Sequence, residues 1–372
     1  MPGRQTQQNA IDDVSVVMPN TSVSTILEND HLCAAGFLPK QVLTKLSFLS
    51  RVLDTVASTG YRFITPTPLT HQRVMAHRSG QTGTTLRDIF GWNQPFALNS
   101  IASELLMFMK QADILQTHGD LYLSTVRISS IADDLFLHSG YPTNQSDAVF
   151  FGPDSYRFSR FIQHSIQASS HWQPMVWPIR HNKPMRILDI GCGSGVGGIV
   201  AALSLAHLDT SLEITMNDIN PVALQYTTVN AACAGIPIKF AKGDALSVVA
   251  GNFDLIICNP PYLYDYSKRI YRHGGDSLGR ALSMRIAVDA LARLNPGGQL
   301  LFYTGVAIID GTDPFLTELL PLLSSAGCEW SYSEIDPDVF GEELVQPLYA
   351  QVDRIAAVGL IARRKSGADL CR

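Results

Sequence analysis

The sequence predicts an α/β fold for the C-terminal part of this 372-residue chain, because short apolar runs alternate there with helix-like stretches. Four of these runs end in a polar side chain, at Asp189, Asp218, Asp244 and Asn259. Stretches of helical length separate them, which is the spacing of a parallel sheet built from strand–helix–strand units. The N-terminal part shows helices followed by two alternating segments, which indicates a separate α+β module.

The first strand is expected over 185–189, and a glycine-rich turn follows its terminal Asp189. The glycines of this turn are Gly191, Gly193 and Gly195. Glycine permits a tight turn and lets a ligand approach the backbone closely. The turn is not the dinucleotide-binding fingerprint, because Val196 stands where the third glycine is required, and no Gly-Lys-Ser/Thr follows to make a P-loop. A helix is expected to begin near Gly197.

The second strand is expected over 212–218 and ends in Asp218. A carboxylate at this position can accept hydrogen bonds from both hydroxyls of a ribose. Pro221 fits the first turn of the helix that follows. A third strand begins near Ile238 and ends in Gly243-Asp244. Taken singly, each acid would be an ordinary turn residue; their order and spacing make them informative.

The fourth strand, expected over 253–257, runs into the loop Asn259-Pro260-Pro261-Tyr262. Proline fixes its own φ and restricts the residue before it, so the carbonyls of this loop and the Asn259 amide point in set directions. A rigid pair of acceptors can hold a planar –NH2 group by both hydrogens. Tyr262 adds a ring on which a flat substrate can stack. The simpler alternative for the tetrapeptide alone is a proline-rich turn after a strand.

The alternation continues to the C-terminus. Further helices are expected over 282–294 and 314–325, and further strands over 299–304, 328–335 and 354–362. The last two strands are expected to form an antiparallel hairpin.

These residues resemble the motifs of the class I methyltransferases that use S-adenosylmethionine (SAM). Asp189 with its glycine turn looks like motif I, and Asn259 to Tyr262 resembles motif IV of members that methylate an amide or exocyclic nitrogen. The resemblance covers roughly residues 150–365. It implies a Rossmann-like, seven-stranded sheet with an antiparallel last strand, SAM as the cofactor, and no metal.

The resemblance also implies roles for individual residues. The implied cofactor-binding residues are Asp189, Gly191, Gly193, Gly195, Asp218, Ile219, Asp244, Ala245 and Asn259. In the family, the motif I acid lies near the amino group of SAM, and the Gly-Asp after the third strand is where the adenine amino group binds. The implied catalytic residues are Asn259, Pro260 and Tyr262, and the implied substrate contacts are Tyr156, Pro261 and Tyr262.

Within this class the chain is similar to the HemK-like branch, which methylates a glutamine side chain of peptide-chain release factors. The glycine-rich segment 273–279 follows motif IV as in that branch. The segment 150–157 occupies the place of the branch's Pro-x-Pro-x-Thr segment, which contacts cofactor and substrate. Here Phe151 or Gly152 replaces the first proline and Ser155-Tyr156 replaces Thr-Glu, so the acceptor does not follow from the resemblance.

Three regions are expected along the chain: a mobile tail over 1–30, a substrate-recognition domain over 31–148, and a catalytic domain over 149–372. Helices near 39–56 and 101–115, followed by alternating segments over 120–129 and 134–138, indicate a winged-helix-like module.

The charge balance bears on the partner. Residues 1–150 carry ten Lys/Arg against twelve Asp/Glu, and this acidic balance argues against nucleic acid as the partner. No cysteine pair is spaced as in a disulfide scaffold or zinc site, and no signal peptide or membrane span is expected, so the predicted location is cytoplasmic.

The sequence therefore predicts a SAM-dependent N-methyltransferase that acts on a protein glutamine or a related small molecule. Two other acceptors stay open, a nucleic-acid base (adenine or guanine) and a specialised metabolite. A non-catalytic SAM-binding scaffold is the alternative from another class. The sequence leaves the oligomeric state and any closure of the N-terminal domain undetermined.

Overall fold

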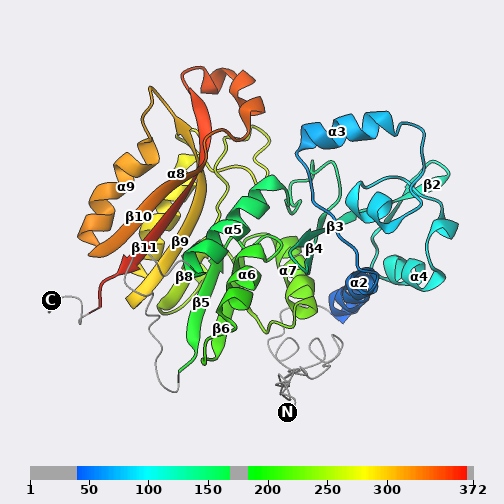
Figure 1. Ribbon diagram of the computed structural model, residues 1–372, viewed down its shortest axis with the longest axis horizontal. Coiled ribbons are helices and arrows are strands. Elements are labelled where there is room, and N and C mark those ends of the chain that lie inside the picture. Colours follow the sequence, from blue (N-terminus) through cyan, green and yellow to red (C-terminus); the bar gives the residue numbers. More distant parts are fainter. Residues whose placement is uncertain (1–39, 168–182, 367–372) are drawn as a thin grey trace, which may run out of the picture.

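The computed structural model describes residues 40–167 and 183–366 of the chain, and the predicted tail over 1–30 lies outside them (Figure 1). A seven-stranded sheet is covered by helices on both faces, and a smaller α+β module packs beside it. Among the helices within these ranges, none is long and apolar enough to cross a membrane.

The large sheet follows the predicted strands closely. Its strands are β5 (Met185–Ile190), β6 (Leu212–Asp218), β7 (Lys239–Lys242), β8 (Phe253–Cys258), β9 (Leu294–Ile308), β10 (Cys328–Asp336) and β11 (Arg354–Arg364). Their order is β10-β11-β9-β8-β5-β6-β7. Strand β11 lies between β9 and β10 and runs antiparallel to both, whereas the other neighbouring pairs are parallel. The predicted Rossmann-like sheet with an antiparallel last strand is therefore confirmed.

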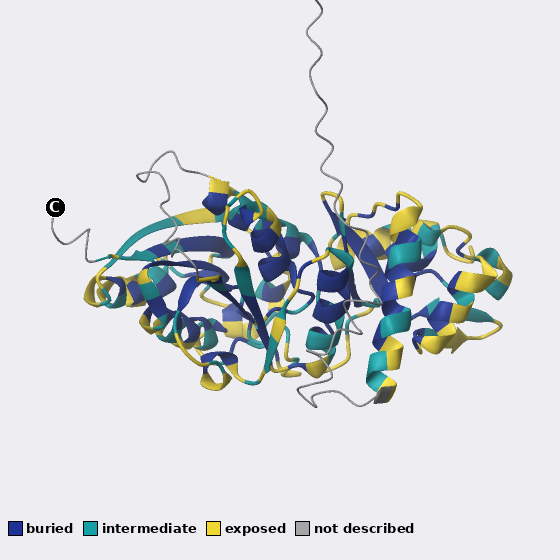
Figure 2. Ribbon diagram, turned by 90° about the horizontal axis from the view of Figure 1, so that it is seen from below, coloured by how far each residue is buried: buried dark blue, intermediate teal, exposed yellow. Residues whose placement is uncertain are grey.

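The central strands bury side chains on both faces, as a parallel sheet must. On β8, Leu255 and Ile257 belong to one core, whereas Ile256 and Cys258 belong to the other. The helices that cover the first face are α5 (Pro153–Gln167), α6 (Val196–Leu205) and α7 (Pro221–Cys233), and those on the second face are α8 (Arg280–Ala292) and α9 (Pro314–Ser325). Figure 2 shows these central strands as a buried layer.

The N-terminal module contains helices and two hairpins. Its elements are α2 (Lys40–Ser58), α3 (Pro68–His77), η1 (Arg87–Gly91), η2 (Leu98–Ser100), α4 (Ser103–Gln111), β1 (Leu115–His118), β2 (Leu121–Ser124), β3 (Val126–Ile131) and β4 (Asp134–Ser139). The predicted hairpin exists as β3 and β4.

The expectation of one continuous strand over 120–129 was wrong. The chain breaks there into β2, which pairs with β1, and β3, which pairs with β4. At the break, the Ser124 hydroxyl bonds to the backbone N–H and carbonyl of Val126. A serine side chain that hydrogen-bonds to nearby backbone groups in this way competes with the hydrogen bonds between strands.

One buried side chain connects the module to the catalytic sheet. Asn230 of α7 is 1% exposed, and its Oδ1 accepts from the Leu137 N–H on β4 at 2.8 Å. Its Nδ2 donates to the carbonyls of Leu137 at 3.0 Å and Ser194 at 2.8 Å. Asn230 therefore extends the pairing of β4 and at the same time holds the glycine-rich turn after β5.

We expect Asn230→Ala to lower the free energy of unfolding by about 3 kcal/mol, because it leaves buried backbone groups of Leu137 and Ser194 without partners. Denaturant titration measures this loss. Thr228→Ala is the matched control on the same helix, since the Thr228 hydroxyl bonds to the Leu224 carbonyl one turn earlier. Equal losses in the two variants would show that Asn230 does not hold the module to the sheet.

Candidate active site

A cavity of about 210 Å³ lies where the parallel strands β5, β6, β7 and β8 end. Ligands bind at this edge in open α/β sheets. The cavity is lined by residues that follow all four strands, by the start of α5, and by the loop after Asn259. The predicted strand-end residues are thus brought to one place.

The glycine turn after β5 forms part of the cavity wall. Gly191 and Gly193 line the cavity with φ values of 68° and 56°, a region that glycine adopts without strain. A Cβ at either position would meet no atom within 4 Å, so open space lies beside the backbone. Gly195 is different: it begins α6 outside the lining, and a Cβ there would press against Thr227 at 3.2 Å.

Asp189 lies behind this turn and not in the cavity wall, which corrects the expectation of a direct cofactor contact. Its Oδ2 accepts from the Gly198 N–H at 2.8 Å, near the first turn of α6. A Cβ at Gly197 would lie 2.7 Å from the same carboxylate. The unpaired N–H groups at the start of a helix attract the carboxylate and draw it under the turn. Burial raises the pKa of Asp189 to about 7, although the Gly198 bond opposes this rise.

Asp218 at the end of β6 lines the cavity. Its Oδ2 accepts from the Gly193 N–H at 2.9 Å and its Oδ1 from the Asn220 N–H at 2.8 Å. Burial raises its pKa, and these backbone bonds oppose the rise. A carboxylate has about four lone-pair directions, so the group keeps capacity for the hydroxyls of a ribose.

The residues predicted for the adenine end also line the cavity. Ile219 is 53% exposed and offers an uncovered apolar side chain beside Asp218. Asp244 and Ala245 follow β7, and Asp244 Oδ1 accepts from Arg285 at 2.7 Å. An open apolar surface next to polar acceptors suits a flat base attached to a ribose, so the residues present fit an adenosine group.

The side chain of Asn259 projects from the end of β8 into the cavity wall, together with Pro260 and Pro261. Its Nδ2 lies 3.4 Å from Oδ2 of Asp154, a long hydrogen bond between the loop and α5. Tyr303 on β9 donates to the other oxygen of Asp154 at 2.6 Å. The loop therefore meets a buried carboxylate of the segment 150–157, a residue to which the sequence motifs assign no role of its own.

The expectation that Tyr262 offers a ring face for stacking is not met. Although Tyr262 belongs to the lining, it is buried, and its ring lies against the backbone of Gly305, where a Cβ would be 2.2 Å from the ring. The ring also meets Phe340 edge-on at 5.8 Å. The Tyr262 ring therefore packs inside the protein, because Gly305 of β9 has no side chain that would prevent this contact.

Tyr156, predicted as a substrate contact, does not line the cavity. Its hydroxyl accepts from the Thr65 N–H at 3.0 Å and so contacts the N-terminal module. Tyr156 lies two residues after Asp154 on α5, about 200° around the helix, and therefore faces away from the cavity. Phe158, one turn after Asp154, does line it.

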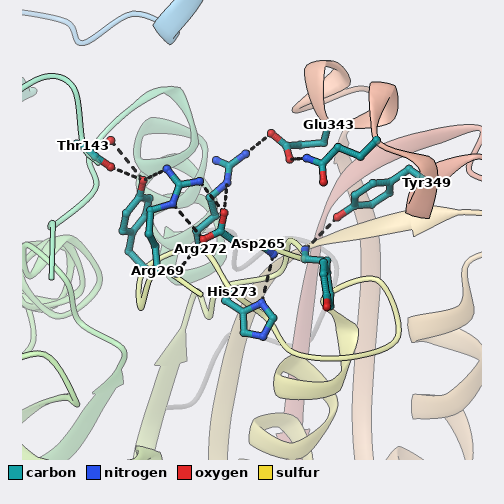
Figure 3. Close-up of polar contacts among 10 residues, drawn as sticks. Thr143, Asp265, Arg269, Arg272, His273, Glu343 and Tyr349 are labelled. Carbon is teal, nitrogen blue, oxygen red and sulfur yellow. Dashed lines mark hydrogen bonds and ion pairs between the residues drawn. The ribbon is translucent and has the colours of Figure 1, made fainter. Parts of the chain in front are cut away.

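A polar network beyond the motif, missed by the sequence analysis, holds the outer wall of the cavity (Figure 3). Arg269 donates to Asp265 at 2.6 Å and lowers the pKa of that carboxyl. Arg272 lies between Asp265 and Glu343. Asp265 and Arg269 lie in an irregular loop, where the four-residue spacing that pairs charges on a helix predicts no ion pair. No signal in the sequence points to Glu343 as the partner of Arg272.

The same wall is tied to the N-terminal module. The Tyr271 hydroxyl donates to the Thr143 carbonyl at 2.8 Å, and the Ile270 N–H donates to the Ser146 carbonyl at 3.3 Å. Ile270, Tyr271 and Arg272 all line the cavity. This part of the cavity wall is therefore held both by the N-terminal module and by the catalytic sheet.

The glycine-rich segment 273–279 packs on the loop of Asn259 from behind. A Cβ at Gly274 would lie 2.6 Å from the Pro261 carbonyl oxygen, and one at Gly279 would lie 2.3 Å from that of Tyr262. Only glycine permits this contact, so the segment supports the loop and is not itself part of the lining.

The raised pKa of Asp189 predicts a pH-dependent change in stability. A carboxyl group with a pKa of about 7 when folded and about 3.9 when unfolded destabilises the folded state as the pH rises between these values. Asp189→Asn keeps an acceptor for Gly198 and cannot ionise. Relative to the parent protein, we expect this variant to gain on the order of 2 kcal/mol of unfolding free energy between pH 5 and pH 8. Urea titrations at both pH values test this, and a pH-independent difference would contradict it.

The chain is similar in part to known methyltransferases. Residues 175–306 match the family model of the methyltransferase small domain. The chain is 34% identical over 175 residues to a release factor glutamine methyltransferase of Deinococcus radiodurans, covering 44% of this chain and 57% of that protein. It is 36% identical over 113 residues to a ribosomal RNA small subunit methyltransferase C of Shewanella loihica, covering 30% and 29% of the two chains. The chain thus spans about half the length, or less, of these curated relatives.

Among solved structures, a ribosomal protein L11 methylase from Lactobacillus delbrueckii is similar with a TM-score of 0.35 and 19% identity, over 58% of this chain and 81% of that one. This similarity is low. The family match at 175–306 agrees with the motifs and with the strand order of the sheet. Residues 175–306 are therefore similar to a methyltransferase small domain.

Proposed function

We propose that the protein transfers a methyl group from SAM to a planar nitrogen, an amide or an amine, of a protein glutamine or a related small molecule. The observation that carries the proposal is the position of the Asn259-Pro260-Pro261-Tyr262 loop. It lies in the same cavity wall as the Asp218 and Ile219 side chains, which fit an adenosine. A nitrogen held by the loop would lie beside the bound cofactor.

The residues around the cavity divide into those that would hold SAM and those that would hold the acceptor. The backbone at Gly191 and Gly193 would lie near the methionine part, Asp218 would bind the ribose, and Ile219 with Ala245 would enclose the adenine. When bound, SAM supplies a methyl group activated by the positive charge on sulfur. The protein then has mainly to position the acceptor nitrogen in line with it.

An amide or ring-attached amine is a poor nucleophile, because its lone pair is delocalised. The two N–H groups of the acceptor nitrogen can donate hydrogen bonds to Asn259 Oδ1 and to the Pro260 carbonyl. These hydrogen bonds raise the electron density on that nitrogen. Both bonds favour the change of geometry at nitrogen as the new bond forms. They therefore stabilise the transition state more than the bound substrate.

Two observations bear on the class of the methyl acceptor: the charge balance of residues 1–150 and the names of the relatives. Relatives named as release factor glutamine methyltransferases support a protein amide. A base in RNA or DNA is the second candidate, since other relatives are named as ribosomal RNA methyltransferases. The acidic balance of residues 1–150 favours a protein or small-molecule acceptor, a specialised metabolite included. We propose that residues 31–148 select it.

Incubation with methyl-labelled SAM and a cell lysate tests the acceptor. We expect label in the protein or small-molecule fraction, and none with Asn259→Ala. Label in RNA or DNA would overturn the acceptor class. No label in any fraction, together with intact SAM binding, would indicate a non-catalytic scaffold.

Asn259→Ala should reduce the rate of methyl transfer by about 10²- to 10³-fold, because one of the two acceptors for the substrate nitrogen is lost. Binding of SAM should change little, which calorimetry measures. A variant that retains near-normal turnover would exclude the role assigned to Asn259.

Asp218→Ala should instead weaken SAM binding by about 10- to 100-fold, because it removes charged hydrogen bonds to the ribose and frees the Gly193 turn. Calorimetric titration with SAM measures the change. Asp209→Ala is the control, since Asp209 is exposed just before β6 and lies outside the cavity lining. Unchanged affinity in Asp218→Ala would place the ribose elsewhere.

A further inference from the structure

Asp154 is a buried carboxylate in the cavity wall, within the segment 150–157, and the sequence motifs assign it no role of its own. It is the second residue of α5, is 4% exposed, and makes no ion pair with a lysine or arginine in the described ranges 40–167 and 183–366. The nearest cation on its helix, Arg157, pairs with Asp336 at 2.7 Å instead. A buried charge is costly unless it is hydrogen-bonded, so its partners show what it does.

All the groups around the Asp154 carboxylate are donors. Tyr303 donates to Oδ1 at 2.6 Å, and Asn259 Nδ2 lies 3.4 Å from Oδ2. The Tyr262 hydroxyl is a third buried polar group near this carboxylate. Burial and the nearby Asp154 charge raise the pKa of that hydroxyl, which keeps it protonated and able to donate.

This arrangement decides which way the Asn259 amide points. An amide has a donating and an accepting end, and Oδ2 of Asp154 lies where it can accept from Asn259 Nδ2, while the other oxygen of Asp154 receives the Tyr303 hydroxyl. The –NH2 end of Asn259 must therefore face Asp154, which leaves Oδ1 for the substrate. If the Asn259 amide rotated by half a turn, its oxygen would face the Asp154 carboxylate, which would be repulsive. Its –NH2 group would then face the N–H groups of the molecule to be methylated, and two donors cannot form a hydrogen bond.

We propose that Asp154 is a positioning residue for methyl transfer, which acts through Asn259 by locking its amide with the oxygen toward the acceptor nitrogen. This inference rests on the proposed function, because that function requires the Asn259 oxygen to face the nitrogen that receives the methyl group. Locking the amide before the substrate arrives removes the cost of reorienting it during the reaction. Tyr303 holds the carboxylate itself, since the two residues meet from α5 and β9.

The test is a double-mutant cycle of Asp154→Ala and Asn259→Ala. The measured quantity is the initial rate of label transfer from methyl-labelled SAM, at saturating SAM, to acceptors in a cell lysate. We expect Asp154→Ala to slow transfer by about 10²-fold, with the affinity for SAM within a few-fold of normal by calorimetry. We expect the double variant to be no slower than Asn259→Ala alone, because Asp154 acts through that side chain.

Asp254→Asn is the matched control. Asp254 is another buried carboxylate of the same domain, it accepts from Asn295 Nδ2 at 2.7 Å, and it lies at the opposite end of β8, outside the cavity lining. Its replacement should leave the transfer rate unchanged. Asp154→Asn is the second variant, used in the same cycle if Asp154→Ala does not fold; one oxygen still accepts, so we expect a smaller loss of about 10-fold.

Each outcome decides the inference. A rate within threefold of normal for Asp154→Ala, or an unchanged rate for Asp154→Asn, would overturn it. A loss in the double variant equal to the product of the single losses would also overturn it, because Asp154 would then act independently of Asn259. If Asn259→Ala itself is fully active, the proposed function fails; if only Asp154→Ala is active, the proposed function stands and this inference alone fails.

Discussion

The parallel alignment of β5, β6, β7 and β8 is the constraint on which the rest of the structure depends. Parallel neighbours bring their carboxyl ends to the same edge, so residues far apart in the sequence converge there. Asp218 and Asn259 lie on different strands yet line one cavity. Helices on both faces bury the sheet and hold this alignment. A shift of one strand by one residue would turn its terminal side chain to the other face.

Three buried carboxylates surround this edge, and each is satisfied by donors of the protein itself. Asp189 accepts from the start of α6, Asp218 from the glycine turn, and Asp154 from Tyr303 and Asn259. Burial raises the pKa of all three groups, which is a cost to folding. The same hydrogen bonds orient the glycine turn and the Asn259 loop before any ligand binds. Burying these carboxylates thus lowers the stability of the fold but pre-organises the site.

The cavity wall at residues 270–272 is held by three parts of the chain. The loop over 263–273 is tied to the N-terminal module through Tyr271 and Thr143, and to the C-terminal segment through Arg272 and Glu343 (Figure 3). Asn230 adds a further connection between the module and the glycine turn. The N-terminal module, the loop over 263–273 and the glycine turn are therefore connected by hydrogen bonds and ion pairs.

The sequence by itself determined the local features: the strands, their polar ends, the glycine turn, and the rigid proline loop. These follow from periodicity and backbone chemistry, which act over a few residues. Only the tertiary structure decided which side chains meet. Asp154 and Asn259 are 105 residues apart, and no local pattern encodes their contact. The same holds for the burial of Tyr262 against Gly305 and the turn of Tyr156 toward Thr65. Partners of this kind depend on how whole helices and strands pack, because packing, and not local propensity, sets the direction in which each side chain finds its neighbour.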